Sequence, residues 1–151
     1  MRIFRIALTD YCDASGEGAK RFGGRWNLPG QPALYGSGSV ATCLLERLTI
    51  DTELFASERY ILYSVMEINV PDELIVQPSP LDLPIGWDDI PPHRASQEFG
   101  AQLISSGVLC FGIPSVVDTT SMNFVVNPQS SSFSTVSYRV FPLELDKRIL
   151  R

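Results

Sequence analysis

The residues best suited to chemistry stand in one short glycine-rich stretch. It reads Arg21-Phe22-Gly23-Gly24-Arg25-Trp26-Asn27. Two adjacent glycines allow backbone conformations that other residues avoid. Arg25 offers a planar fork of donors that suits a diphosphate or a carboxylate, and Trp26 offers a flat stacking surface. The stretch therefore predicts either an anion-binding loop or a rigid loop whose tryptophan fills the core.

Four other side chains are candidates for the same site. Arg5 stands in an otherwise apolar segment, so it either pairs with an anion or points to solvent. Glu46 lies at the edge of an amphipathic segment and is either a catalytic carboxylate or a solvated one. Tyr35 suits ligand stacking, a hydrogen bond to ribose or a core position, and Ser115 suits a ligand contact or a turn. The residues by themselves leave these alternatives open.

Several common signatures of enzymes are absent. His93 is the only histidine and lies among prolines, so we expect neither a metal site nor a Ser/His/Asp triad. The glycines do not follow a strand and open a helix with the spacing of a dinucleotide-binding Rossmann fold. A Walker A pattern is also missing.

Composition limits the class of protein. The 151 residues fit one domain, residues 1–151, and the hydrophobic share of 44% is enough for a real core. A net charge of −5 argues against direct binding of nucleic acid or an anionic membrane. Cys12, Cys43 and Cys110 have no paired spacing, which is typical of reduced thiols. With neither a membrane-spanning run nor a signal peptide in the sequence, we expect a cytoplasmic protein.

Hydrophobic periodicity predicts two helices, over residues 40–48 and 94–105. Ser39 is the expected N-cap of the first helix, and Gly107 is the expected end of the second. Residues 9–32 are predicted to form one long loop. Strands are predicted over residues 3–8, 33–35, 60–70, 74–76, 108–113, 123–126 and 136–141. Because strands outnumber helices and do not alternate with them, the expected fold class is α+β, with a mixed or antiparallel sheet.

The order of these motifs resembles the RES-domain family, which is named for an arginine, a glutamate and a serine. The resemblance is carried by Gly23-Gly24-Arg25-Trp26-Asn27, Leu34-Tyr35-Gly36, residues 41–46, Ile113-Pro114-Ser115 and residues 123–128. It extends from about residue 4 to about residue 128. Many members have a histidine just after the Asn-Pro pair, where this chain has Gln129 and Ser130.

The resemblance implies an ADP-ribosyltransferase-like domain and a toxin that consumes NAD, paired with an Xre-type antitoxin. It assigns catalysis to Arg5, Arg25 and Glu46, and NAD binding to these three with Tyr35 and Ser115. Arg5 and Arg25 would together face the diphosphate. NAD would be a substrate, with no cofactor and no metal, and inorganic phosphate would be a possible co-substrate.

The implied reaction is cleavage of the bond between nicotinamide and ribose, by a glycohydrolase or a phosphorylase. Two alternatives stay open. One is a toxin that transfers ADP-ribose to a protein. The other is a non-enzymatic module that binds a nucleotide or a protein partner, which the departure at Gln129 would fit.

Overall fold

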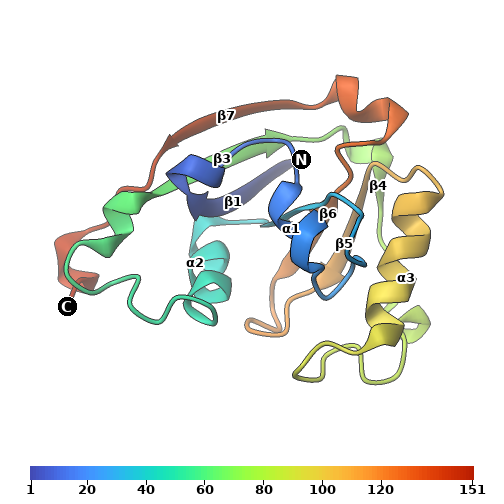
Figure 1. Ribbon diagram of the computed structural model, residues 1–151, viewed down its shortest axis with the longest axis horizontal. Helices are drawn as coiled ribbons and strands as arrows, with labels where there is room; N and C mark the ends of the chain where they lie inside the picture. Colours follow the sequence, from blue (N-terminus) through green and yellow to red (C-terminus); the bar gives the residue numbers. More distant parts are fainter.

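The computed structural model describes residues 1–151, which fold around one seven-stranded sheet (Figure 1). The strands follow the order β4-β5-β6-β2-β1-β3-β7, and every neighbouring pair is antiparallel except β4–β5. Their bounds are β1 Arg2–Leu8, β2 Leu34–Ser37, β3 Tyr63–Asn69, β4 Ile75–Val76, β5 Cys110–Pro114, β6 Met122–Val126 and β7 Ser137–Pro142. The helices are α1 Glu17–Phe22, α2 Val40–Leu48 and α3 Arg94–Ser105. This mixed sheet with three helices confirms the α+β class.

The two predicted helices form with the expected bounds. Ser39 caps α2, since its hydroxyl accepts a hydrogen bond of 3.1 Å from the backbone N–H of Thr42. After α3, Gly107 adopts a φ of +88° and donates its N–H to the carbonyl of Ile104. Both ends follow the capping rules that the sequence displays.

The prediction of one long loop over residues 9–32 is wrong, because this segment contains helix α1. None of the residues of α1 is buried, so it carries no apolar stripe. Its N-cap is Gly16, which has no side chain to accept a capping hydrogen bond. The predicted strand over residues 60–70 also starts late, because a 3-10 turn at Arg59–Leu62 precedes β3.

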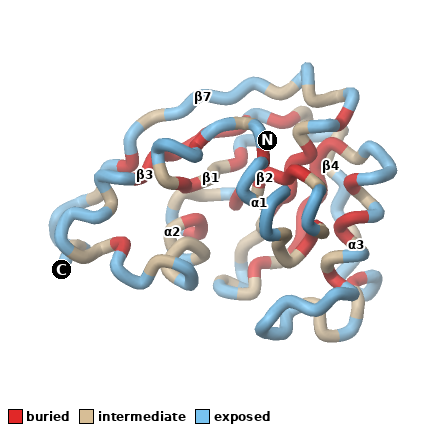
Figure 2. Tube along the Cα trace, viewed as in Figure 1, coloured by how far each residue is buried: buried red, intermediate tan, exposed pale blue.

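The core lies mainly along the strands, and much of β7 is exposed (Figure 2). Side chains from five strands meet in one buried cluster, around which the sheet curls: Ile3, Leu34, Met66, Ile68, Cys110, Phe124 and Val126. Helix α2 packs on a second cluster through Cys43, and α3 packs on a third through Ile104. The three cysteines are free and buried, as expected of reduced thiols. None of the helices combines the length and apolar character that crossing a membrane requires.

The sheet opens between β1 and β2. These strands pair in register at one position, Phe4 with Ser37, whereas β1 pairs with β3 along its whole length. Beyond that position Arg5 and Ile6 face the start of β2 across a gap instead of a hydrogen-bonded ladder. The split gives access to side chains that a continuous sheet would bury.

Gly100 brings helix α3 into direct contact with the glycine-rich loop, residues 23–27. A Cβ at this position would lie 1.9 Å from the carbonyl oxygen of Trp26, which is backbone and cannot turn aside. We therefore expect Gly100→Ala to lower the free energy of unfolding by about 3 kcal/mol, measured by denaturant titration. Gly18→Ala in α1 is the matched control, since its Cβ would meet nothing within 4 Å. Equal stability of the two variants would contradict this packing.

Candidate active site

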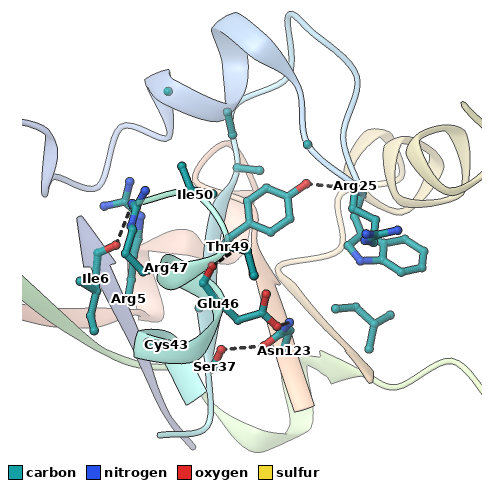
Figure 3. Close-up of a pocket in the computed structure, with 18 of the residues that line it drawn as sticks. Arg5, Ile6, Arg25, Ser37, Cys43, Glu46, Arg47, Thr49, Ile50 and Asn123 are labelled. Atoms are coloured by element: carbon teal, nitrogen blue, oxygen red, sulfur yellow. Dashed lines mark hydrogen bonds between the residues drawn. The ribbon is translucent and has the colours of Figure 1, made fainter. Parts of the chain in front are cut away.

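A cavity of about 530 Å³ lies at the split between β1 and β2 (Figure 3). Strands β1 and β2 line it together with α1, α2, the glycine-rich loop and β6. Its charged lining residues are Arg5, Arg25, Glu46 and Arg47. The cavity therefore combines three guanidinium groups with one carboxylate, although the whole chain carries a net charge of −5.

Glu46 projects from the last part of α2 and is half-buried. Its Oε1 accepts two hydrogen bonds of 2.6 Å, one from the hydroxyl of Ser115 and one from Nδ2 of Asn123. Both bonds go to the same oxygen, so Oε2 keeps its lone pairs for a ligand. Glu46 makes no salt bridge with any of the arginines. The carboxylate is thus held in one orientation, with one oxygen available.

A second hydrogen bond fixes the amide that holds Glu46. Ser37 Oγ, which is buried, donates to Oδ1 of Asn123 at 2.6 Å. This contact turns the Nδ2 of Asn123 toward the carboxylate, as Figure 3 shows. Ser37 in β2 and Asn123 in β6 are register partners across the sheet. The sheet itself therefore sets the position of Glu46.

Arg5 and Arg47 lie near each other at one side of the cavity (Figure 3). Neither forms a salt bridge with a carboxylate of the chain. Arg47 Nη2 donates to the carbonyl of Ile6 at 3.0 Å, and Arg5 makes a long bond of 3.4 Å to the carbonyl of Tyr11. Burial, and to a smaller extent the charge of Arg47, lower the pKa of the Arg5 guanidinium. Such a pair of cations is stabilised by an anion placed between them.

Arg25 lies on the other side of the cavity from Arg5 (Figure 3). Its Nη1 donates to the carbonyl oxygens of Trp87 and Asp89, at 2.7 and 2.8 Å. These bonds use one nitrogen and leave Nε and Nη2 for a ligand. Arg25 is therefore held by backbone oxygens and forms no salt bridge with a carboxylate of the chain.

The rest of the glycine-rich loop lines the cavity in part, through Gly23, Gly24 and Trp26, and is held in place by its own packing. Trp26 is buried and packs against Trp87 and Phe99, with ring centroids 5.9 and 6.0 Å apart. Asn27 is fully buried, and its Nδ2 donates to three backbone carbonyls. The buried tryptophan confirms the alternative of a rigid loop whose tryptophan fills the core, and Asn27 fixes the path of the same loop.

Tyr35 lines the cavity while its hydroxyl is engaged by the loop. Oη donates to Oδ1 of Asn27 at 2.7 Å and accepts from the N–H of Trp26 at 3.0 Å. A Cβ on Gly24 would lie 2.6 Å from this hydroxyl, so a glycine is required there. Burial raises the pKa of Tyr35, which keeps the hydroxyl protonated as a donor. The ring, rather than the hydroxyl, is the part of Tyr35 that a ligand can contact.

The structure brings four of the five expected site residues to the cavity wall: Arg5, Arg25, Tyr35 and Glu46. Ser115 is buried behind Glu46 and also caps the turn that follows it, accepting from the N–H groups of Val117 and Asp118. Its contact with the site runs through the carboxylate. Gln129 lines neither this cavity nor the one beside it. Arg47 and Asn123 were not among the expected residues.

Comparison with known proteins shows which family this chain belongs to. The RES domain family matches residues 2–146. This chain belongs to the RES domain family. A curated relative from Yersinia enterocolitica, named Toxin Res, is 32% identical over 95% of this chain and 94% of its own length. A relative from Sphingobium, named Prs ADP-ribosylating toxin, is 36% identical over 77% of this chain and 73% of its own.

The fold of this RES protein also occurs in a solved structure. The crystal structure of the MbcT–MbcA toxin–antitoxin complex of M. tuberculosis contains a chain with a TM-score of 0.76. The likeness covers 94% of this chain and 83% of that one, at 22% sequence identity. At this identity the likeness concerns the fold. The family match and the curated relatives named Toxin Res make this chain a toxin-type member of the RES family.

Proposed function

We propose that this RES protein is an enzyme that consumes NAD by breaking the bond between nicotinamide and ribose. One observation carries the proposal: the oriented carboxylate of Glu46 shares a cavity with three guanidinium groups that form no salt bridge. NAD presents the complementary groups, an anionic diphosphate and a ribose carbon that becomes positive during cleavage. The name of the Sphingobium relative, an ADP-ribosylating toxin, is consistent with NAD as substrate.

In the proposed reaction Glu46 acts on the ribose. The electron pair of the C–N bond leaves with nicotinamide, whose ring nitrogen loses its positive charge, and positive charge develops on the ribose carbon. The carboxylate of Glu46 stabilises that charge and accepts a hydrogen bond from a ribose hydroxyl through Oε2. An acceptor oxygen then bonds to the carbon and gives up its proton. Water yields ADP-ribose, and inorganic phosphate yields ADP-ribose phosphorylated at that carbon.

The arginines bind the substrate in this proposal. Arg5 and Arg47 hold the diphosphate from one side through charge-assisted hydrogen bonds, and Arg25 completes the positive lining on the other side. The ring of Tyr35 packs against the bound nucleotide. Ser115 acts as a positioning residue for Glu46. NAD serves as a substrate here, and inorganic phosphate is the possible co-substrate.

The direct test is incubation of the freshly purified protein with NAD, with and without phosphate, followed by mass analysis of the products. We expect free nicotinamide in both reactions if water is the acceptor, and only in the reaction with phosphate if phosphate is the acceptor. ADP-ribose alone identifies a glycohydrolase, and a phosphate-dependent phosphorylated product identifies a phosphorylase. NAD that stays intact in both reactions would contradict the proposal.

A second candidate is transfer of ADP-ribose to a protein, which the name of the Sphingobium relative favours. The same cleavage would then end on a side chain of a target. Labelled NAD added to a cell extract would place its ADP-ribose label on a protein band. Release of all label as free ADP-ribose would exclude this route.

The proposed partner is an Xre-type antitoxin. The solved structure that shares this fold is of a toxin–antitoxin complex, which supports such a partner here. Expressed alone, the active toxin should deplete cellular NAD and arrest growth, whereas a non-enzymatic binding module should not. Co-expression with a small helix-turn-helix protein encoded beside the toxin gene should restore growth. Unimpeded growth without that partner would contradict the toxin proposal.

Arg5 allows binding to be separated from stability. Its charge is desolvated and forms no salt bridge, so Arg5→Met removes an unfavourable charge from the unliganded protein. We expect an unchanged or higher melting temperature together with roughly a tenfold to hundredfold rise in KM for NAD. Arg2→Met on the same strand is the control, since Arg2 is exposed and lines neither cavity. An Arg5→Met protein of lower stability and unchanged KM would show that this arginine is structural.

A further inference from the structure

A smaller cavity of about 410 Å³ adjoins the larger one. Six residues line both: Arg25, Trp26, Glu46, Thr49, Ile50 and Asn123. The five residues that line the smaller cavity alone are apolar: Ile90, Pro92, Pro114, Val116 and Val117. Glu46 therefore lies at the junction of a cationic cavity and an apolar one.

The arrangement of the two cavities determines how a molecule that reacts at Glu46 is oriented. Arg5 and Arg47 line the larger cavity and do not line the smaller one. A substrate whose anionic part lies on these arginines reaches Glu46 with its reacting carbon. Its remaining group must then extend past Glu46, toward the apolar cavity. In NAD that group is nicotinamide, a planar ring that is uncharged once the bond is broken.

We infer that the smaller cavity is the leaving-group subsite and takes a planar aromatic carboxamide. The inference rests on the proposed function, because it needs the ribose to lie at Glu46. Apolar walls from Pro114, Val116 and Val117 on one segment, and from Ile90 and Pro92 on another, contact the faces of the ring. The amide of Asn123 and the guanidinium of Arg25 at the junction offer polar partners for the carboxamide.

The test compares two ligands on a protein that does not consume them. In a Glu46→Gln background, NAD and ADP-ribose share the part that fills the larger cavity and differ in nicotinamide. Val117→Trp adds volume to the smaller cavity at a side chain that is 41% exposed, so the fold should tolerate it. We expect the Kd for NAD to rise about tenfold or more while the Kd for ADP-ribose stays the same. Val140→Trp on β7, 44% exposed and outside both cavities, is the matched control.

A second variant uses charge instead of volume. The nicotinamide ring of intact NAD is cationic, so Ile90→Arg should repel it and again weaken NAD but not ADP-ribose. The inference is overturned if both variants bind the two ligands with the parental ratio of affinities, or if both ligands weaken together. If the Glu46→Gln parent binds neither ADP-ribose nor NAD, the proposed function itself is contradicted, and the inference about the subsite fails with it.

Discussion

Glu46→Gln should slow NAD consumption by about 1,000-fold and leave the protein folded. Glutamine keeps the shape of the side chain and can still accept the hydrogen bonds of Ser115 and Asn123. It removes the negative charge that stabilises the developing positive charge on the ribose carbon. The rate of nicotinamide release under saturating NAD is the measurement, and thermal unfolding reports on the fold.

Glu144→Gln is the matched control for this prediction. Glu144 is exposed, forms no salt bridge and lines neither cavity, so its variant should react at the wild-type rate. A Glu46→Gln protein that consumes NAD at the wild-type rate would remove Glu46 from the catalytic role. The cavity would then be a binding site whose chemistry lies elsewhere.

Asn123→Asp should lower kcat by about 100-fold and change KM much less. The substitution preserves the shape of the side chain but places a carboxylate 2.6 Å from Oε1 of Glu46, where the amide now donates. Two carboxylates at this distance repel each other or share a proton, and either outcome disturbs the group that acts on the ribose. The hydroxyl of Ser37, which now orients the amide, can bond to the new carboxylate and keep it in place.

The pH profile distinguishes this positioning role from a general loss of structure. A shared proton makes the activity of Asn123→Asp depend on pH more steeply than that of the wild type. Asn69→Asp at the exposed end of β3 is the control and should keep the wild-type profile. Wild-type kcat and pH profile in Asn123→Asp would show that the bond to Glu46 is incidental.

Much of the fold could be predicted because its signals are local. Helices α2 and α3 have amphipathic stripes, and α2 also has the cap Ser39, so their bounds follow from the chain itself. The short helix α1 has neither signal, since it buries none of its residues. The strands could be placed to within a few residues. The split between β1 and β2 could not, because it depends on pairing between distant segments.

The site was predicted only as far as the family resemblance extends. Spacing alone left Arg5 equally free to face solvent, and only the split in the sheet turns it toward the cavity. Asn123 reaches Glu46 because β6 lies beside β2, a pairing of residues far apart in sequence. Arg47 follows Glu46 on a helix surface, where a charge is usually solvated, and its reach to the carbonyl of Ile6 depends on tertiary packing.

The proposed function requires that the guanidinium groups and one carboxylate form a single dinucleotide site. A calorimetric titration of the Glu46→Gln protein with NAD tests this without turnover. We expect saturable binding at one site per chain, weakened roughly tenfold or more when Arg5→Met is added. Absence of binding to the folded Glu46→Gln protein, or equal affinity with and without Arg5, would contradict it.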